Sequence, residues 1–168
     1  MTTDSRISAK ESVAYIFPGQ GSQSVGMGKE LYNNSLPARR IFDEIDAALD
    51  VQLTRILFEG PEDKLKETIN AQPAILATSL ALLETIRDSD EFSPKDKPQF
   101  VAGHSLGEYT ALVASNALSV VDAALLVRER GRLMQEASAK CPGGMAAVLG
   151  LDEGEIKEIC AKSDVQIS

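Results

Sequence analysis

The sequence predicts an α/β protein in which helices cover a parallel sheet. Two short apolar runs, residues 13–17 and 99–103, have the length and the β-branched and aromatic content of buried strands. Helical patterns separate these runs, and parallel strands need such crossover connections. The pentapeptide at 103–107 then joins the second strand to a helix through a sharp, glycine-rich turn. Because only two strands are clear in this region, we expect the sheet to be incomplete.

The first half of the chain predicts one strand followed by helices. Residues 18–23 form the loop after the strand. The apolar spacing predicts helices near 28–33, at 36–49, at 53–58, from 61 onward and at 73–87. Pro61 and the two acidic residues after it are typical of a first helical turn. The helix at 73–87 carries few charges, so we expect it to be buried.

The second half begins with a polar loop at 88–98 that contains two prolines. Helices are predicted behind Ser105, at 120–137 and at 152–161, the last with Asp152 as its N-cap. The apolar runs at 145–149 and 165–167 predict a strand and the opening of another.

Composition excludes several classes of function. The chain has 168 residues with 43% hydrophobic and 25% charged side chains, which is the normal globular range. A net charge of -8 argues against a nucleic-acid binder. The longest apolar region, 73–86, is interrupted by polar residues and is shorter than the roughly 20 residues that cross a bilayer. Residues 1–12 predict a disordered leader without a secretory or transit signal. We therefore expect a cytoplasmic protein that binds no membrane.

Metal and disulfide chemistry are also disfavoured. Cys141 and Cys160 have neither C-x-x-C spacing nor the density of a disulfide scaffold. His104 is the only histidine, which argues against a metal site built by the protein. We expect reduced thiols and no metal.

The pentapeptide at 103–107 is a G-x-S-x-G motif, and it makes Ser105 a candidate nucleophile for acyl transfer. Its glycines let the backbone turn tightly, so that the serine Oγ stands beside the amino end of a helix. Free backbone N–H groups at that end can stabilise an oxyanion. For the pentapeptide alone, a glycine-rich turn without chemistry is the alternative.

Two further segments could serve such a serine. The loop at 19–23 follows a strand, lacks the spacing of a phosphate or dinucleotide loop, and can present a backbone N–H to an oxyanion; a plain turn is equally consistent with it. Arg128, Arg130 and Arg132 lie on an otherwise apolar helix. One of them could hold a substrate carboxylate, and a solvated charged face is the alternative.

Together these segments resemble the malonyl-CoA:acyl carrier protein transacylase family of fatty-acid and polyketide synthesis. The segments that carry the resemblance occur in one order, at 15–23, 71–74, 103–109, 130–131 and 145–151. The resemblance extends from residue 13 to the end of the chain.

The resemblance implies a role for each site residue. Ser105 matches the family nucleophile, which takes the malonyl group as an ester. Gln20 and Leu106 match the positions whose backbone N–H groups form the oxyanion hole. Arg130 matches the arginine that pairs with the free malonyl carboxylate. His104 matches the histidine beside the nucleophile, which is not the general base, and it is counted with Gln20 among the substrate-binding residues.

The family fold implied is an α/β-hydrolase-like parallel sheet core with an inserted ferredoxin-like subdomain. Residues 13–137 would then be the N-terminal part of the large acyltransferase subdomain, and residues 138–168 the truncated start of the ferredoxin-like one. The implied substrates are malonyl-CoA and the phosphopantetheine thiol of acyl carrier protein, with no cofactor. The full-length form is expected to be monomeric.

One departure from the family bears on activity. The family's catalytic histidine follows the segment at 145–151, and this chain ends at Ser168 without it. His104 is expected to project away from the Ser105 Oγ, and a serine without a base is a poor nucleophile. We therefore expect an inactive fragment.

Two alternatives remain at this point. An α/β-hydrolase esterase or thioesterase explains the pentapeptide but neither Gln20 nor Arg130. The other alternative is a non-catalytic, truncated fragment that binds acyl groups or a complementary chain.

Overall fold

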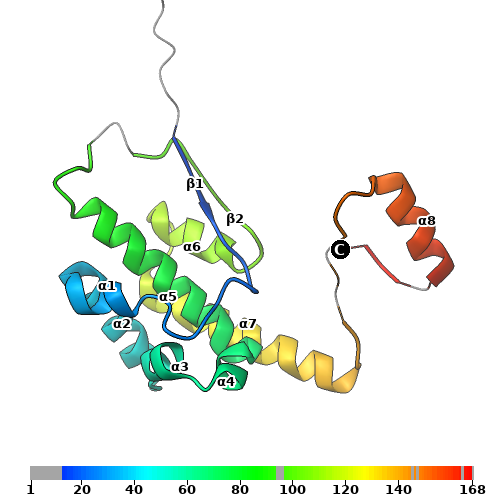
Figure 1. Ribbon diagram of the computed structural model, residues 1–168, viewed down its shortest axis with the longest axis horizontal. Helices are drawn as coiled ribbons and strands as arrows, with labels where there is room; N and C mark the ends of the chain where they lie inside the picture. Colours follow the sequence, from blue (N-terminus) through cyan, green and yellow to red (C-terminus); the bar gives the residue numbers. More distant parts are fainter. Residues whose placement is uncertain (1–12, 94–96, 145, 147, 164, 168) are drawn as a thin grey trace, which may run out of the picture. The chain divides into compact units, whose positions relative to one another are not determined.

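We analysed a computed structural model of the chain, which describes residues 13–93, 97–144, 146, 148–163 and 165–167. Its elements, drawn in Figure 1, are β1 (Ala14–Phe17), α1 (Lys29–Asn34), α2 (Leu36–Leu49), α3 (Leu53–Glu59), α4 (Glu62–Lys66), α5 (Thr68–Arg87), β2 (Phe100–Gly103), α6 (Gly107–Ala114), α7 (Val120–Lys140) and α8 (Glu153–Ser163). The chain separates into two compact units, and the division falls after Ala137.

Local capping explains where several helices begin. The Ser35 hydroxyl accepts a hydrogen bond from the Ala38 N–H at 3.3 Å, which caps α2. Helix α4 begins at Glu62, one residue after the predicted start, and Pro61 is its N-cap. In α8 the predicted cap is confirmed, because the Asp152 carboxylate accepts from the Glu155 N–H at 2.9 Å. The Glu155 carboxylate accepts in turn from the Asp152 N–H at 3.1 Å, which completes a capping box.

Helix α5 begins earlier than the sequence predicted. The apolar pattern and the low charge of residues 73–87 predict a helix that begins at Pro73. The structure instead starts α5 at Thr68 and carries Pro73 inside the helix. A proline there lacks the N–H that would bond to the Ile69 carbonyl. Burial outweighs this loss, since 11 of the 20 residues of α5 are buried.

The main hydrophobic core lies between α2, α3, α5 and α7. The largest fully buried apolar side chains of these helices are Phe42, Ile45, Leu53, Leu57, Ile75, Leu76, Leu80 and Val127. By length and composition α5 could cross a membrane, yet 61% of its most apolar stretch is already buried inside the protein. A core helix of a water-soluble protein has the same properties, so α5 is no argument for a membrane role.

The two strands pair in parallel, as the sequence predicted. In their register Ala14 lies opposite Phe100, and Phe17 opposite Gly103 (Figure 1). The sheet of the described residues contains only these two strands. Phe17 is buried and packs with Leu83 of α5 and with α6.

The other face of this sheet is exposed. Side chains alternate between the faces of a strand, so Ile16 and Phe100 point away from the side on which Phe17 packs. Ile16 is 78% exposed and Phe100 68% exposed. Apolar side chains this exposed are unusual on parallel strands, which are normally covered on both sides.

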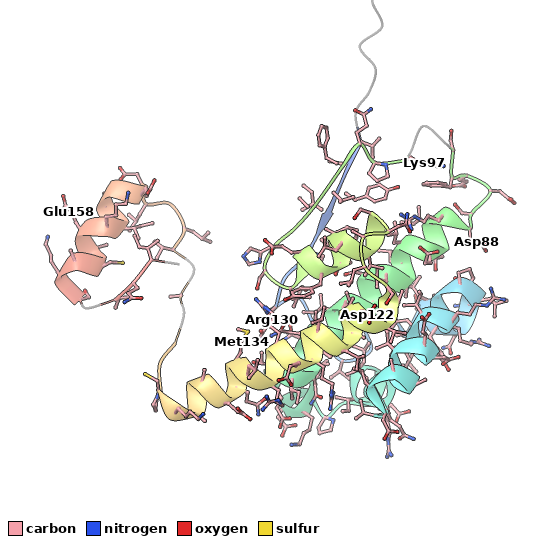
Figure 2. The ribbon with its side chains drawn as sticks, turned by 180° about the vertical axis from the view of Figure 1, so that it is seen from behind. Asp88, Lys97, Asp122, Arg130, Met134 and Glu158 are labelled. Carbon is pink, nitrogen blue, oxygen red and sulfur yellow. The ribbon has the colours of Figure 1, made fainter. Side chains whose placement is uncertain are left out.

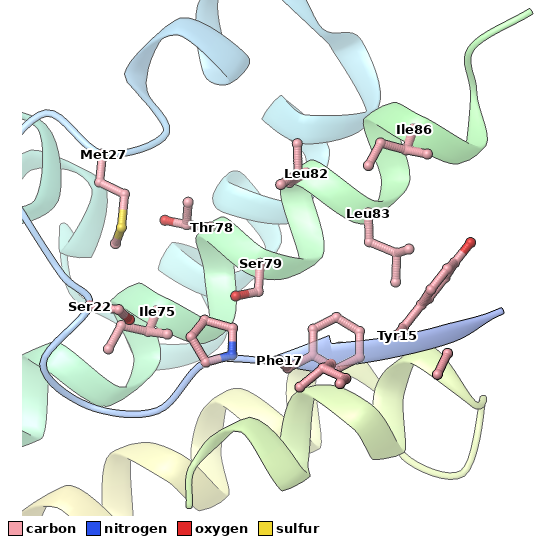
Figure 3. A pocket seen from close by; sticks show the side chains of 13 residues that line it. Tyr15, Phe17, Ser22, Met27, Ile75, Thr78, Ser79, Leu82, Leu83 and Ile86 are labelled. Carbon is pink, nitrogen blue, oxygen red and sulfur yellow. The ribbon is translucent and has the colours of Figure 1, made fainter. Parts of the chain in front are cut away.

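A cavity of about 470 Å³ lies between β1 and α5. Figure 3 shows Tyr15 and Phe17 of β1 opposite Leu82, Leu83 and Ile86 of α5 along its wall. The candidate nucleophile and the three arginines of α7 are not among its lining residues. We therefore do not assign this cavity to the acyl-transfer site.

Two strand predictions are wrong for the residues that the structure describes. Ala146, Val148 and Leu149 have no strand conformation, nor do residues 165–167. A strand needs a neighbour for its N–H and C=O groups, and the described part of this second unit contains none. Leu149 is accordingly 90% exposed. Met145 and Ala147 lie outside the described residues, as does the predicted leader at 1–12.

Candidate active site

Ser105 lies in the tight turn between β2 and α6. Its φ is 55°, in the left-handed region, which costs a non-glycine residue about 1–2 kcal/mol. Strained backbone of this kind gathers at functional sites, and a nucleophile elbow holds its serine in this way. The predicted sequence of strand, sharp turn and helix is confirmed here.

The two glycines of the motif are required by close backbone packing. A Cβ atom on Gly103 would lie 2.0 Å from the carbonyl carbon of Gly107. A Cβ on Gly107 would lie 2.5 Å from the carbonyl oxygen of Phe17 at the end of β1. No real Cβ tolerates such distances, so only glycine fits at either position. The end of β1, the turn and the start of α6 are therefore pressed together around Ser105.

The loop after β1 packs directly on this turn. A Cβ on Gly19 would lie 2.5 Å from Nδ1 of His104 and 2.8 Å from its carbonyl oxygen. Gln20 follows Gly19, so its backbone is brought beside the elbow, and Leu106 follows Ser105 directly. In the part of the chain that the structure describes, neither the Gln20 nor the Leu106 N–H donates to a protein acceptor. These are the two positions predicted for the oxyanion hole.

Arg130 reaches Ser105 from α7. Its Nη2 donates to the Ser105 Oγ at 2.9 Å, and its Nη1 donates to Oε1 of Gln72 at 2.6 Å. Figure 2 shows Arg130 and Met134 one turn apart on the same side of α7. The structure thus brings together two residues that the sequence proposed for one site.

The charge of Arg130 is not neutralised by a neighbouring carboxylate. Among the described residues, its two partners are a hydroxyl and an amide, and no acidic oxygen lies within 4.0 Å. Arg132 differs, because it forms ion pairs with Glu129 and Glu136 on the same helix. Those hydrogen bonds raise the pKa of Arg132 above its ordinary value. A guanidinium without a carboxylate partner beside a candidate nucleophile suits a substrate that carries its own negative charge.

His104 contributes no hydrogen bond to the serine. Its backbone N–H donates to the Phe17 carbonyl at 3.0 Å, and its ring lies against Gly19. Within the described residues, no hydrogen bond joins its imidazole to Ser105. The described part of the chain therefore gives the serine no histidine base. It also brings together no cluster of three metal-binding side chains.

Sequence reasoning missed Gln72 as a residue of this site. It is fully buried at 0% exposure, and its hydrogen bond with Arg130 joins α5 to α7. The segment at 71–74 had contributed to the family resemblance, but no role followed from it. The available signal was an amide directly before the apolar helical stretch predicted at 73–87.

The comparison with known protein families agrees with this geometry. The family described as "Acyl transferase domain" matches residues 14–168. The chain belongs to this family. The predicted resemblance to malonyl-CoA:acyl carrier protein transacylases is likewise confirmed. A relative in Bacillus subtilis, named malonyl CoA-acyl carrier protein transacylase, is 50% identical over 150 residues, covering 89% of this chain and 46% of the relative.

Solved structures of this acyl transferase family share the fold. An acyl-carrier-protein S-malonyltransferase from Bartonella henselae superposes with a TM-score of 0.80 at 44% identity, over 90% of this chain and 48% of that one. A malonyl-transacylase solved in complex with its type II PKS acyl carrier protein gives a TM-score of 0.78 at 37% identity. The chain thus spans about half the length of these relatives.

Proposed function

We propose that Ser105 is the nucleophile of a malonyl transferase. In this reaction the malonyl group passes from malonyl-CoA to the phosphopantetheine thiol of acyl carrier protein through a malonyl-serine ester. The observation that carries the proposal is the hydrogen bond from the Arg130 guanidinium to the Ser105 Oγ. A positive charge held one hydrogen bond from the nucleophile favours a short acyl group with a free carboxylate at its far end.

Each residue then has a distinct task. The Ser105 Oγ attacks the thioester carbonyl, and the N–H groups of Gln20 and Leu106 stabilise the oxyanion that forms. The substrate carboxylate takes a hydrogen bond from Arg130, and the CoA thiol leaves. In the second half of the reaction the carrier-protein thiol attacks the serine ester, and Ser105 regains its proton.

A general base is needed to take the serine proton. We propose that it is a histidine outside these 168 residues, because His104 is the only histidine among them and lies against Gly19. The part of the relatives that this chain does not match has room for such a residue. Residues 1–168 alone would then be inactive.

The wider expectations follow from the same proposal. Acyl carrier protein is the proposed partner, supported by the relative solved in complex with one. We propose a cytoplasmic reaction that uses no cofactor, carried out by a protein that is monomeric in its full-length form. We also propose that β1 and β2 begin an α/β-hydrolase-like core. The division after Ala137 supports a ferredoxin-like subdomain opening at residue 138.

The alternatives explain less of the site. An esterase or thioesterase uses the same elbow but gives Arg130 and its free charge no task. A non-catalytic fragment that binds acyl groups or a complementary chain accounts for neither the strained φ of Ser105 nor the two unpaired N–H groups.

The test is mass spectrometry of the full-length protein after mixing with malonyl-CoA. The wild type should gain one malonyl group, and Ser105→Ala should gain none. A peptide map should place the group on the peptide that contains residues 103–107. Labelling that survives in Ser105→Ala would move the nucleophile elsewhere and end the proposal.

A further inference from the structure

Gln72 is a buried amide, and residues of α7 form hydrogen bonds with both of its polar atoms. Its Oε1 accepts from Nη1 of Arg130 at 2.6 Å, and its Nε2 donates to the sulfur of Met134 at 3.3 Å. A fully buried amide is costly unless both ends find partners. Arg130 can only donate, whereas the Met134 sulfur can only accept. The Gln72 amide therefore has a single satisfactory orientation, with its oxygen toward the guanidinium.

A close approach of α5 to α7 brings Gln72 and Arg130 within reach. Gly131 follows Arg130, and a Cβ on Gly131 would lie 2.6 Å from the Thr68 carbonyl oxygen and 2.8 Å from the Ile69 Cα. The backbones of the two helices thus touch at this point. Gln72 lies one turn after Thr68 on α5, so its position relative to Arg130 is set by two packed helices rather than by a loop.

The neutrality of this partner matters for the charge of the site. An amide holds the guanidinium by a hydrogen bond without neutralising it. A carboxylate at the same place would form an ion pair, as Glu129 and Glu136 do with Arg132. Gln72 thus leaves Arg130 both fixed in place and free to attract an anion.

We propose that Gln72 is a positioning residue that holds the Arg130 guanidinium beside Ser105 and thereby sets the preference of the site for acyl groups with a free carboxylate. This inference rests on the malonyl-transfer function proposed above. Gln72 acts only through Arg130, and it touches neither the acyl group nor the thioester. Its loss should therefore change the selectivity of the site more than its reactivity.

Gln72 accepts a hydrogen bond from Arg130, and it carries no charge. Two variants of the full-length protein test these two properties separately. Gln72→Met keeps an unbranched side chain but removes the acceptor, so Arg130 loses one of its two anchors. The rate of ester formation with malonyl-CoA, divided by the rate with acetyl-CoA, should fall about tenfold or more, as expected for a hydrogen bond to a charged group. Gln72→Glu keeps the acceptor and adds a charge that competes with the substrate carboxylate. It should also lose malonyl transfer while acetyl transfer continues.

Asn70 provides the matched control on the same helix. It is another buried amide of α5, 7% exposed, and its Nδ2 donates to the Lys64 carbonyl at 2.9 Å, away from Arg130. Asn70→Leu should lower the melting temperature but leave the malonyl-to-acetyl ratio unchanged. The inference is overturned if both rates fall by the same factor in Gln72→Met, or if Asn70→Leu shifts the ratio equally.

A spectroscopic measurement decides the role of Gln72 without relying on turnover. In ¹⁵N NMR spectra, the Nη protons of Arg130 should be resolved in the wild type, because two hydrogen bonds restrict rotation of the guanidinium. They should average or shift in Gln72→Met. Unchanged Arg130 signals would overturn the inference. A wild type that forms no malonyl ester would instead overturn the proposed function, and the NMR comparison would still report whether Gln72 holds Arg130.

Discussion

Ser105 and Arg130, which are 25 positions apart in the chain, are joined by a 2.9 Å hydrogen bond from the guanidinium Nη2 to the serine Oγ. The bond connects the strained turn after β2 with the middle of α7. A donor at this position stabilises negative charge on or near the serine oxygen. Under the proposed function, the bond must also open, at least in part, when a substrate carboxylate binds the guanidinium.

Replacement of the arginine should reverse the acyl preference. Arg130→Ala should lose malonyl transfer and keep or gain acetyl transfer, because the guanidinium is useful only where a carboxylate needs a partner. The lost charged hydrogen bonds correspond to about 1.5–3 kcal/mol. Steady-state rates with the two acyl-CoA substrates measure this in the full-length protein. Arg132→Ala removes two surface ion pairs and is the control, with a milder effect on both rates. Equal losses for both substrates would make Arg130 a structural residue.

The backbone strain at Ser105 should be measurable as a difference in the free energy of unfolding between two variants. Ser105→Gly and Ser105→Ala both remove the Oγ and its bond to Arg130, so the two variants differ only in backbone freedom. Glycine adopts a φ of 55° without the Cβ clash. Ser105→Gly should be more stable than Ser105→Ala by about 0.5–1 kcal/mol once the entropy of glycine is deducted. Urea denaturation of the two variants provides the comparison, and equal midpoints would mean that the turn is relaxed.

The packing of the elbow should not tolerate a methyl group. Gly107→Ala places a Cβ 2.5 Å from the Phe17 carbonyl oxygen, so the start of α6 must move away from the end of β1. We expect a loss of about 1–3 kcal/mol in the free energy of unfolding. Gly144→Ala is the control, because no atom lies within 4 Å of the added Cβ and no positive φ is required there. If the two variants unfold at the same denaturant concentration, the contact between the start of α6 and the end of β1 is not rigid.

The exposed face of the sheet should make the 168-residue polypeptide self-associate. Ile16 and Phe100 are 78% and 68% exposed on neighbouring parallel strands, and uncovered apolar faces and strand edges invite pairing. Sedimentation velocity should show oligomers or aggregates that decrease in the double variant Ile16→Thr, Phe100→Thr. Leu149→Thr, at a 90% exposed position in the other unit, should change nothing. A monomer with a sharp thermal transition would instead show that residues 1–168 fold as a self-sufficient domain.

The local elements could be predicted because their causes are local. The glycines at 103 and 107, the cap at Asp152 and the apolar spacing of α2 act within a few residues, so the sequence predicts their structure directly. The parallel pairing of β1 with β2 also followed, since helices between two strands permit it. The strands predicted at 145–149 and 165–167 were wrong for the described residues, because strand formation depends on a neighbour that spacing cannot supply.

The sequence by itself determined the elbow, the identity of the candidate nucleophile and the resemblance to a family. The resemblance had already selected Arg130 among the three arginines of α7. Tertiary structure alone decided that its guanidinium donates to the Ser105 Oγ and to Gln72, and that α5 extends back past Pro73. The physical reason is the contact between α5 and α7 at Gly131, where two backbones approach within a distance that no side chain allows. Only this packing brings Gln72 within hydrogen-bonding distance of the Arg130 guanidinium, which also donates to the Ser105 hydroxyl.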